Sequence, residues 1–392
     1  MNPSSSSPPD APPTTTDALR GLTRDRPGAS APLAELSRID AGLPPGCETV
    51  GLPVRWTHRR TDDVPVAELA AEYDLLEIEH AWLGAAVAAD CLMPLDDLLG
   101  TAPLARWRAG SVGPAFTAYE WGGRPWAVPY DVTAQMSAAR TDLLRGEALP
   151  ATWDEVMASA LPMTLCLGGP HALLTLCALS LSLGERPGEG AEFVSAGVGE
   201  QALETMASLA ARSDERLWRQ RPDDVLAALA GADGPTYCPL VPGHAAATRC
   251  GPYPLTFGAA PAARPGGTRG SVFGGTGLAV SRRRAADPLI REALRDHLGR
   301  LLADPVQCGL FPVTGGQPAA RAAWTDPRTD RRWGGFFRTT LDTVDGSWVR
   351  PRGVGFPAFQ RAASELLRTA LAEGRPARPV VTDLNRLYRQ RS

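Results

Sequence analysis

Residues 73–99 read YDLLEIEHAWLGAAVAADCLMPLDDLL, and this stretch indicates the architecture of the chain. Its first part, residues 73–80, is a short apolar run that ends in Glu79 and His80, as expected of a buried strand reaching the edge of a sheet. Residues 81–99 predict a helix followed by a loop. Polar side chains between a strand and a helix are a frequent binding position in α/β proteins.

The segments before this stretch have the same order of strand and helix. We predict strands at 18–23 and 51–59, and helices at 32–42 and 64–73. Strands that alternate with helices form a parallel or mixed sheet covered by helices, so we expect an α/β fold.

Further elements follow along the chain. We predict strands at 124–132, 162–169 and 274–281, and helices at 149–161, 171–184, 199–212, 222–230, 287–305, 357–373 and 381–389. Thr152 and Asp287 stand where N-caps belong. The many prolines of segment 237–267 predict loops with one short strand.

Composition excludes several classes of function. All 40 basic residues are arginine, so the chain has neither a Schiff-base lysine nor a P-loop lysine. A net charge of −3 gives no general attraction to nucleic acid, and the longest apolar run, 172–184, is too short to span a membrane. The seven cysteines form no C-x-x-C motif, and we expect neither a metal nor another cofactor.

The first residues bear on location. Residues 1–16 are mostly serine, proline and threonine, which predicts a disordered tail. They contain no apolar run of the kind a secretory signal needs, and the scattered cysteines suit reduced thiols. We therefore expect a cytoplasmic protein, or an extracytoplasmic one if translation starts further upstream.

Four segments together resemble a known family. They are residues 73–99, quoted above; GGRPWAVPYDVTAQMSAARTDLL (122–144) with LPATWDEV (149–156); YCPLVPG (237–243); and residues 274–321, from GGTGLAVS to QPAAR. In this order they resemble the sugar-type extracellular solute-binding proteins of bacterial ABC importers. The likeness spans about residues 18–388.

The resemblance implies a clam-shell of two α/β lobes, the type II periplasmic-binding-protein-like fold, in which hinge crossings let the lobes close on a ligand. Lobe 1 would comprise residues 17–132 and 278–312, and lobe 2 residues 133–277 and 313–392. It also implies a small carbohydrate-like ligand, and an ABC permease as partner if the protein is exported.

Candidate ligand-binding residues lie where predicted strands end. Asp25 follows the first strand, although an aspartate in such a turn is also a common loop cap. Glu79, His80 and Trp82 follow the third strand and together offer hydrogen bonds and a stacking surface to a polyol. The alternative is that Glu79 caps a helix and Trp82 packs in the core.

Other candidates lie near the expected crossings. Tyr130 and Asp131 stand at the first crossing, where the resemblance turns such a pair towards the cleft. Tyr237 belongs to the second-lobe loop, and Gly274 and Gly275 allow close approach to a ligand or simply a sharp entry into a strand.

Trp348 and Arg350 form a late cluster in which the arginine suits a carboxylate or phosphate, unless it is only a solvated loop charge. Two functions remain open. The first is binding of a small polar ligand without chemistry. The second is a cytoplasmic, cofactor-independent cyclase, isomerase or hydrolase that uses His80, Glu79 and Asp131 for acid–base catalysis.

Overall fold

The computed structural model describes residues 18–24, 27–41, 52–59, 64–144, 146–249 and 251–391. Its main sheet has the strand order β2-β1-β3-β10-β7-β8, with β4 paired to β10 and β9 paired to β7. The strands are β1 (Leu19–Thr23), β2 (Val54–His58), β3 (Leu75–Ile78), β4 (Leu92–Met93), β7 (Ala127–Arg140), β8 (Tyr237–Pro242), β9 (Leu255–Gly258) and β10 (Phe273–Ser281). A separate two-stranded sheet pairs β5 (Glu120–Trp121) with β6 (Arg124–Pro125).

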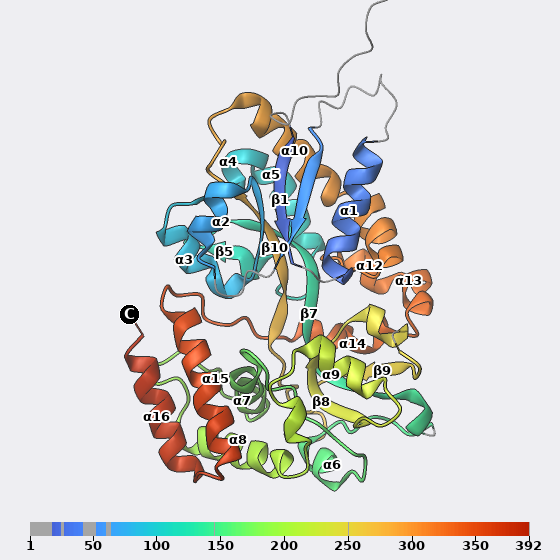
Figure 1. Ribbon diagram of the computed structural model, residues 1–392, viewed down its shortest axis with the longest axis vertical. Coiled ribbons are helices and arrows are strands. Elements are labelled where there is room, and N and C mark those ends of the chain that lie inside the picture. Colours follow the sequence, from blue (N-terminus) through green and yellow to red (C-terminus); the bar gives the residue numbers. More distant parts are fainter. Residues whose placement is uncertain are drawn as a thin grey trace, which may run out of the picture.

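Helices surround this sheet in two groups (Figure 1). They are α1 (Pro27–Ala41), α2 (Val66–Glu72), α3 (Leu83–Ala88), α4 (Leu95–Leu99), α5 (Thr101–Gly110), α6 (Trp153–Ala158), α7 (His171–Ser182), α8 (Ala196–Ala210), α9 (Pro222–Leu229), α10 (Pro288–Leu301), α11 (Phe311–Thr314), α12 (Arg321–Thr325), α13 (Pro327–Arg332), α14 (Phe336–Asp345), α15 (Phe356–Ala372) and α16 (Ala377–Arg389). No helix of the described residues is long and apolar enough to cross a membrane.

Two long antiparallel strands, β7 and β10, join the two halves of the molecule (Figure 1). We call the half around β1–β4 the upper half and the half around β8 and β9 the lower half. The first residues of β7 pair with β10 beside the upper strands, and its last residues pair with β8 and β9. The register of β7 and β10 shifts between Thr276 and Gly277, so the sheet is irregular where the halves meet.

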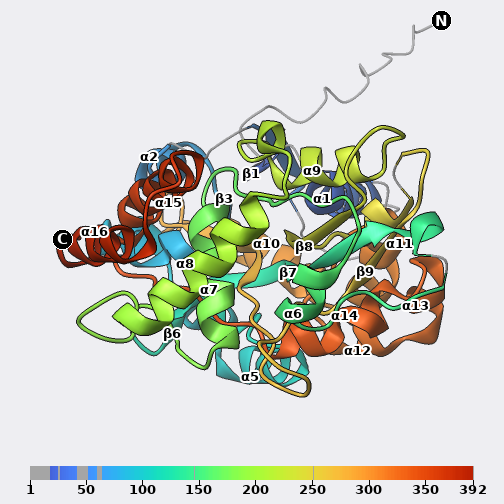
Figure 2. The same ribbon diagram turned by 90° about the horizontal axis from the view of Figure 1, so that it is seen from below.

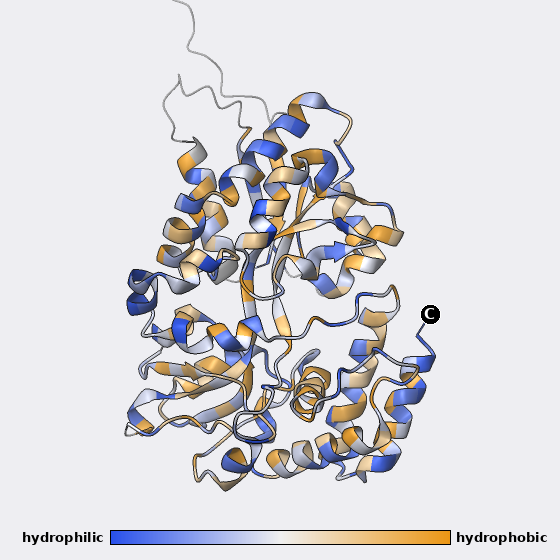
Figure 3. Cartoon of the chain, turned by 180° about the vertical axis from the view of Figure 1, so that it is seen from behind, coloured by the Kyte–Doolittle hydropathy of each residue, from blue (hydrophilic) through white to orange (hydrophobic). Residues whose placement is uncertain are grey.

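Each half has its own apolar core. In the upper half, α1 and α10 pack on the strands through buried residues such as Leu19, Leu33 and Leu294. In the lower half, α7, α8, α15 and α16 pack against one another (Figure 2). Almost all of α7 is buried, and it is the strongly apolar coil at the centre of the lower half in Figure 3. A further core cluster contains residues from both halves, including Leu76 and Phe257.

The predicted α/β two-lobe fold is confirmed, and most predicted elements are present. The caps predicted at Thr152 and Asp287 are confirmed, because each side chain accepts a hydrogen bond from a backbone amide at the start of α6 or α10. The proposed lobe boundaries stay a prediction. The expected tail, residues 1–16, lies outside the described residues.

Four expectations about elements were wrong. The loop expected after the helix in residues 81–99 contains the short strand β4 and the helix α4. Residues 162–169 are mostly buried but form no strand, because only Met163 makes isolated bridges, to Ser213 and Tyr237. Segment 237–267 contains two strands, not one. The strand expected to end at residue 132 runs on to Arg140, since its second part pairs with those two strands.

Candidate functional site

A cavity of about 550 Å³ lies between the upper and lower halves, against the strands that join them. Its lining residues are Arg24, Glu79, Trp82, Thr133, Ala134, Gln135, Gly168, Gly169, Pro170, His171, Leu174, Arg221, Pro222, Asp223, Pro242, His244, Val272, Phe273, Gly274, Gly275, Thr276, Arg350, Pro357, Gln360, Arg361, Glu365 and Arg368. The ends of β1 and β3 supply its upper wall, and the first turns of α7 and α9 together with one face of α15 supply much of its lower wall.

The upper wall is built around the carboxylate of Glu79, which directly follows β3. Its Oε1 accepts a hydrogen bond of 2.6 Å from Nη1 of Arg24, and its Oε2 one of 3.3 Å from Nη2 of Arg350. Burial raises the pKa of Glu79, but the two guanidinium groups outweigh burial and hold the pKa well below its usual range. Glu79 is therefore a fixed negative charge at neutral pH.

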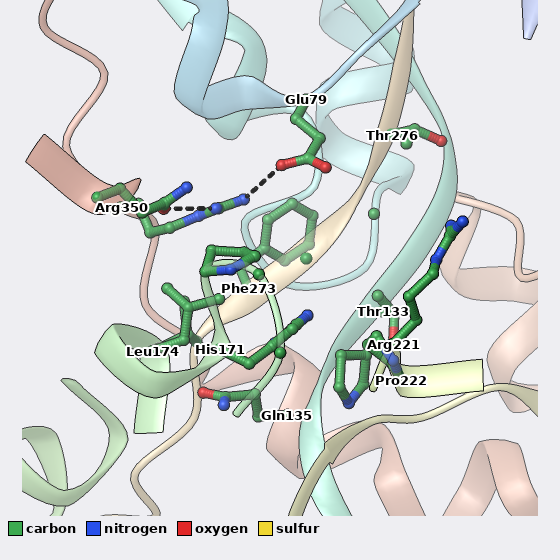
Figure 4. A pocket seen from close by; sticks show the side chains of 18 of the residues that line it. Glu79, Thr133, Gln135, His171, Leu174, Arg221, Pro222, Phe273, Thr276 and Arg350 are labelled. Atoms are coloured by element: carbon green, nitrogen blue, oxygen red, sulfur yellow. Dashed lines mark hydrogen bonds and ion pairs between the residues drawn. The ribbon is translucent and has the colours of Figure 1, made fainter. Parts of the chain in front are cut away.

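Arg350 connects distant parts of the chain behind this wall (Figure 4). Its guanidinium is almost fully buried and also donates to Oε1 of Gln360 on α15 (2.8 Å) and to Nε2 of His80 (3.3 Å). Burial first, and then the charge of Arg350, lower the pKa of His80 well below its ordinary value. His80 is therefore neutral, and it is not among the residues that line the cavity.

The middle of the cavity is formed by the two joining strands. Thr133 and Gln135 of β7 face it, together with Phe273 and Thr276 of β10. The side chain of Gln135 is 2% exposed, and neither its amide nitrogen nor its carbonyl oxygen has a hydrogen-bond partner among the described residues. An unpaired buried carboxamide costs about 1–3 kcal/mol, so a ligand that hydrogen-bonds to this group would recover that cost.

The lower wall combines helix starts with charged side chains. Gly168 to His171 lead into α7, and Arg221 precedes Pro222, the first residue of α9. Burial, followed by the charge of Arg350, lowers the pKa of His171 to about 4, so its imidazole is neutral at pH 7. In Figure 4, Glu79 and Gln135 lie at opposite ends of the cavity, with Arg350 and Arg221 on opposite sides.

Several residues predicted from the sequence come together here. Glu79, Trp82, Gly274, Gly275 and Arg350 all line the cavity, although they come from three distant parts of the chain. Their role as ligand contacts stays a prediction. Asp25, the remaining candidate of the upper half, lies outside the described residues.

The other predicted residues lie away from the cavity surface. Tyr130 is buried and donates its hydroxyl to Glu77 (2.7 Å), and Asp131 is buried on the same strand. Tyr237 is also fully buried. Trp348 is buried, and its backbone bridges Val272 next to β10. Tertiary packing explains the difference, because β7 is buried over its whole length and only some of its side chains point to the cavity.

Sequence reasoning missed Gln135 on the joining strand β7 and the residues of the lower wall, among them His171, Arg221 and Arg361. Two local signals were present in the sequence. Residues 168–171 (GGPH) stand directly before a buried helix, and Arg221 stands directly before a helix-starting proline. Neither signal indicates by itself that the two helix starts face the same space.

In the part of the chain that the structure describes, no group of three or more histidine, cysteine or acidic residues is placed to hold a metal ion. Cys238, in the segment predicted as the second-lobe loop, is buried, and burial raises the pKa of its thiol to about 12. Its thiol therefore stays protonated at neutral pH.

Comparison with known proteins gives a family match over part of the chain and a fold for nearly all of it. The family described as bacterial extracellular solute-binding protein matches residues 66–218. No curated protein matches the sequence at a significant level. The resemblance seen in the sequence to solute-binding proteins of ABC importers is thus confirmed.

Solved structures match nearly the whole chain. Maltose-bound MalE3 of Thermotoga maritima is 18% identical with a TM-score of 0.76, covering 95% of this chain and 98% of that one. A solute-binding protein of Agrobacterium radiobacter K84 in complex with ribitol is 15% identical with a TM-score of 0.79, covering 97% and 100%. UgpB of Mycobacterium tuberculosis in complex with glycerophosphocholine is 16% identical with a TM-score of 0.75, covering 95% and 97%. At these identities the likeness establishes the fold.

Proposed function

Because the chain has the fold of bacterial extracellular solute-binding proteins and matches their family over residues 66–218, we propose that it binds a small, polar, carbohydrate-like ligand between its two halves. The observation that carries this proposal is the cavity itself. It has a volume of about 550 Å³, within the range of roughly 300–1,000 Å³ usual for small-molecule sites. Both halves and both joining strands contribute to its wall, so a ligand there would hold the halves together.

The lining suits a molecule that carries hydroxyl groups on an apolar carbon skeleton. Trp82 and Phe273 offer aromatic surface, and Glu79, Gln135 and Thr133 offer hydrogen-bonding groups. The structurally similar proteins named above were solved with maltose, ribitol and glycerophosphocholine, all of which carry hydroxyls. A ligand of this kind would contact the aromatic rings with its carbon atoms and the polar side chains with its oxygens.

The geometry favours binding over catalysis. The acid–base alternative needs an imidazole that reaches a substrate, but His80 is fully buried and accepts a hydrogen bond from Arg350. Asp131 does not line the cavity, and Glu79 is held by two arginines. A carboxylate in such a pair is a poor general base because its pKa is low.

The proposed function has consequences for the protein's partner and for its cellular location. A solute-binding protein delivers its ligand to an ABC permease, which we propose as partner if this protein is exported. Our expectation from the sequence remains a cytoplasmic location, where a receptor of this fold would act as a sensor or a carrier. Cell fractionation with an antibody to the protein separates the two cases.

Ligand titration tests the proposal. The purified chain is screened by thermal unfolding against sugars, polyols and sugar acids, and hits are measured by calorimetry. A ligand present at 100 times its dissociation constant should stabilise the protein by about 2.7 kcal/mol, which raises the melting temperature by several degrees. The variant Trp82→Ala should bind at least about tenfold more weakly, because it loses an aromatic contact.

A matched control is Trp107→Ala, a tryptophan of α5 that does not line the cavity. This variant should bind like the natural chain. Absence of any thermal shift or binding heat up to millimolar ligand would refute the proposed function. Equal losses in both tryptophan variants would show that the ligand binds elsewhere.

A further inference from the structure

Arginine dominates the charge of the cavity wall. The charged residues that line it are Arg24, Arg221, Arg350, Arg361, Arg368, Glu79, Asp223 and Glu365. Five arginines face three carboxylates, so the wall carries a formal excess of two positive charges. This excess of positive charge attracts an anion, whereas it does not attract a neutral sugar.

Three of these arginines are already engaged with carboxylates. Arg24 and Arg350 share Glu79, with N–O distances of 2.6 and 3.3 Å, and Arg24 also lies 3.7 Å from the buried carboxylate of Glu77. Arg368 pairs with Glu365 at 2.7 Å. The charges of these three side chains are largely compensated within the protein. These arginines therefore hold the wall in place and contribute little to the attraction of a ligand.

Arg221 and Arg361 are different. Neither forms an ion pair with a carboxylate of the described residues, and both are exposed at the cavity. The guanidinium of Arg361 lies over the ring of Trp82, 5.6 Å from its centre, which positions a cation beside the aromatic surface. Arg221 enters from the start of α9, on the side opposite Arg350 (Figure 4). Guanidinium groups without a carboxylate partner are well suited to bidentate contact with a carboxylate or phosphate.

The start of α7 adds a further positive element to the same wall. Residues Gly168 to His171 line the cavity, and they lead into a helix of 12 residues whose N-terminal end carries partial positive charge. Gln135 indicates a ligand contact independently of the charges, since its buried carboxamide has no partner among the described residues. Its NH₂ group is a donor for a ligand oxygen.

We propose that the ligand carries an anionic group, a carboxylate or a phosphate ester, which binds at Arg221, while Arg361 adds positive charge to the same cavity. The hydroxyl-bearing part of the ligand then lies against Trp82 and Gln135. This inference rests on the proposed function, because it names the chemical class of the ligand for the same cavity. Neutral sugars and polyols are accordingly the poorer ligands of this protein.

Matched series of compounds test the inference. The purified full chain is titrated by calorimetry with glucose, glucuronate and glucose 6-phosphate, and with ribitol, ribonate and ribitol 5-phosphate, in a low-salt buffer without phosphate. Inorganic phosphate and acetate are titrated alone. The charged member of a series should bind at least about tenfold more tightly than its neutral counterpart, and added salt should reduce this preference. The charged member that binds more tightly shows whether the anionic group is a carboxylate or a phosphate.

Two variants connect the preference to the structure. Arg221→Gln should reduce the preference for the charged member by about tenfold, and Arg361→Gln should reduce it by a smaller factor. Arg186→Gln removes a charge from an exposed arginine that pairs with Glu189 outside the cavity, and it should leave the preference unchanged. Melting temperatures of the unliganded variants show that they fold, as expected for substitutions of exposed side chains.

The outcomes separate the inference from the proposed function. A neutral member that binds as tightly as its charged counterpart would overturn the inference and support the proposed function. A preference that survives in both cavity variants would also overturn it. If no compound binds, or if inorganic phosphate alone binds as tightly as the sugar phosphates, the proposed carbohydrate-like ligand is wrong.

Discussion

Arg350 is the side chain whose removal should affect this structure most clearly. It is 4% exposed and donates three hydrogen bonds, to Glu79, His80 and Gln360. The variant Arg350→Met keeps much of the buried hydrophobic stem but removes all three bonds. Oε1 of Gln360 and Nε2 of His80 then lose their donor, while Glu79 keeps Arg24 as partner.

The size of the effect follows from these contacts. An unsatisfied buried acceptor costs about 1–3 kcal/mol, and breaking a buried ion pair typically costs about 3–5 kcal/mol. Glu79 retains one of its two arginines, so we expect the lower part of that range. The free energy of unfolding should therefore fall by about 3 kcal/mol.

Urea unfolding measured in parallel by circular dichroism and tryptophan fluorescence gives this value. Coincidence of the two transitions checks that unfolding is a single step. The matched control is Arg186→Met on the surface, which should change stability by less than about 0.5 kcal/mol. In a double-mutant cycle with Glu79→Gln, the two losses should be non-additive by at least about 1 kcal/mol. A loss below about 1 kcal/mol for Arg350→Met would refute the reasoning.

Three further predictions concern the strands, the cavity histidine and the thiols. Gly275→Ala should destabilise the protein by about 2–4 kcal/mol in thermal unfolding, because φ is +101° and a β-carbon would clash with a backbone carbonyl of β7. The control is Gly299→Ala on α10, where a β-carbon has no atom within 4 Å, and it should be neutral or stabilising. The pKa of His171 is about 4 in the folded protein, below its ordinary value near 6.5, so the unfolded chain binds more protons between these two pH values. The free energy of unfolding should therefore fall as the pH drops from 6.5 to 4. Urea titrations at pH 7 and pH 4.5 should show that His171→Gln removes about 2–3 kcal/mol of this loss. Iodoacetamide should label Cys91, which is partly exposed, in the native protein, whereas buried Cys238 should be labelled only after unfolding; peptide mapping that finds Cys238 labelled first would contradict its burial.

The order of elements was predictable because local signals were strong. Short apolar runs gave β1, β3 and β10, and polar caps such as Asp287 marked helix starts. The strand predicted at residues 162–169 is absent because an apolar run alone does not make a strand. A strand needs a continuous partner, and Met163 finds only isolated bridges.

The prediction for segment 237–267 was wrong for the opposite reason. Its prolines argue against regular structure, yet Pro239 and Pro242 are part of β8. Proline is tolerated there because β8 ends the strand order, so one of its edges requires no backbone donor. The position of a strand within the sheet is a tertiary property and is not visible in the local sequence.

The candidate site was predictable only where strands end. Glu79 and Trp82 follow β3, so the general rule for α/β sheets found them. The lower wall, with Arg221 and Arg361, depends on how α9 and α15 are placed in space, and sequence spacing does not reveal that. Similarly, nothing in the local sequence shows that Arg283 and Arg284 contact the buried carboxylate of Asp74, more than 200 residues earlier in the chain.

A crystal structure of the protein with the tightest compound of the charged series tests the central claim most directly. The account predicts electron density for the ligand between the halves, with its anionic group at Arg221 and its carbon skeleton against Trp82. Density at another surface, or a ligand in the cavity whose charged group points away from both Arg221 and Arg361, would contradict it.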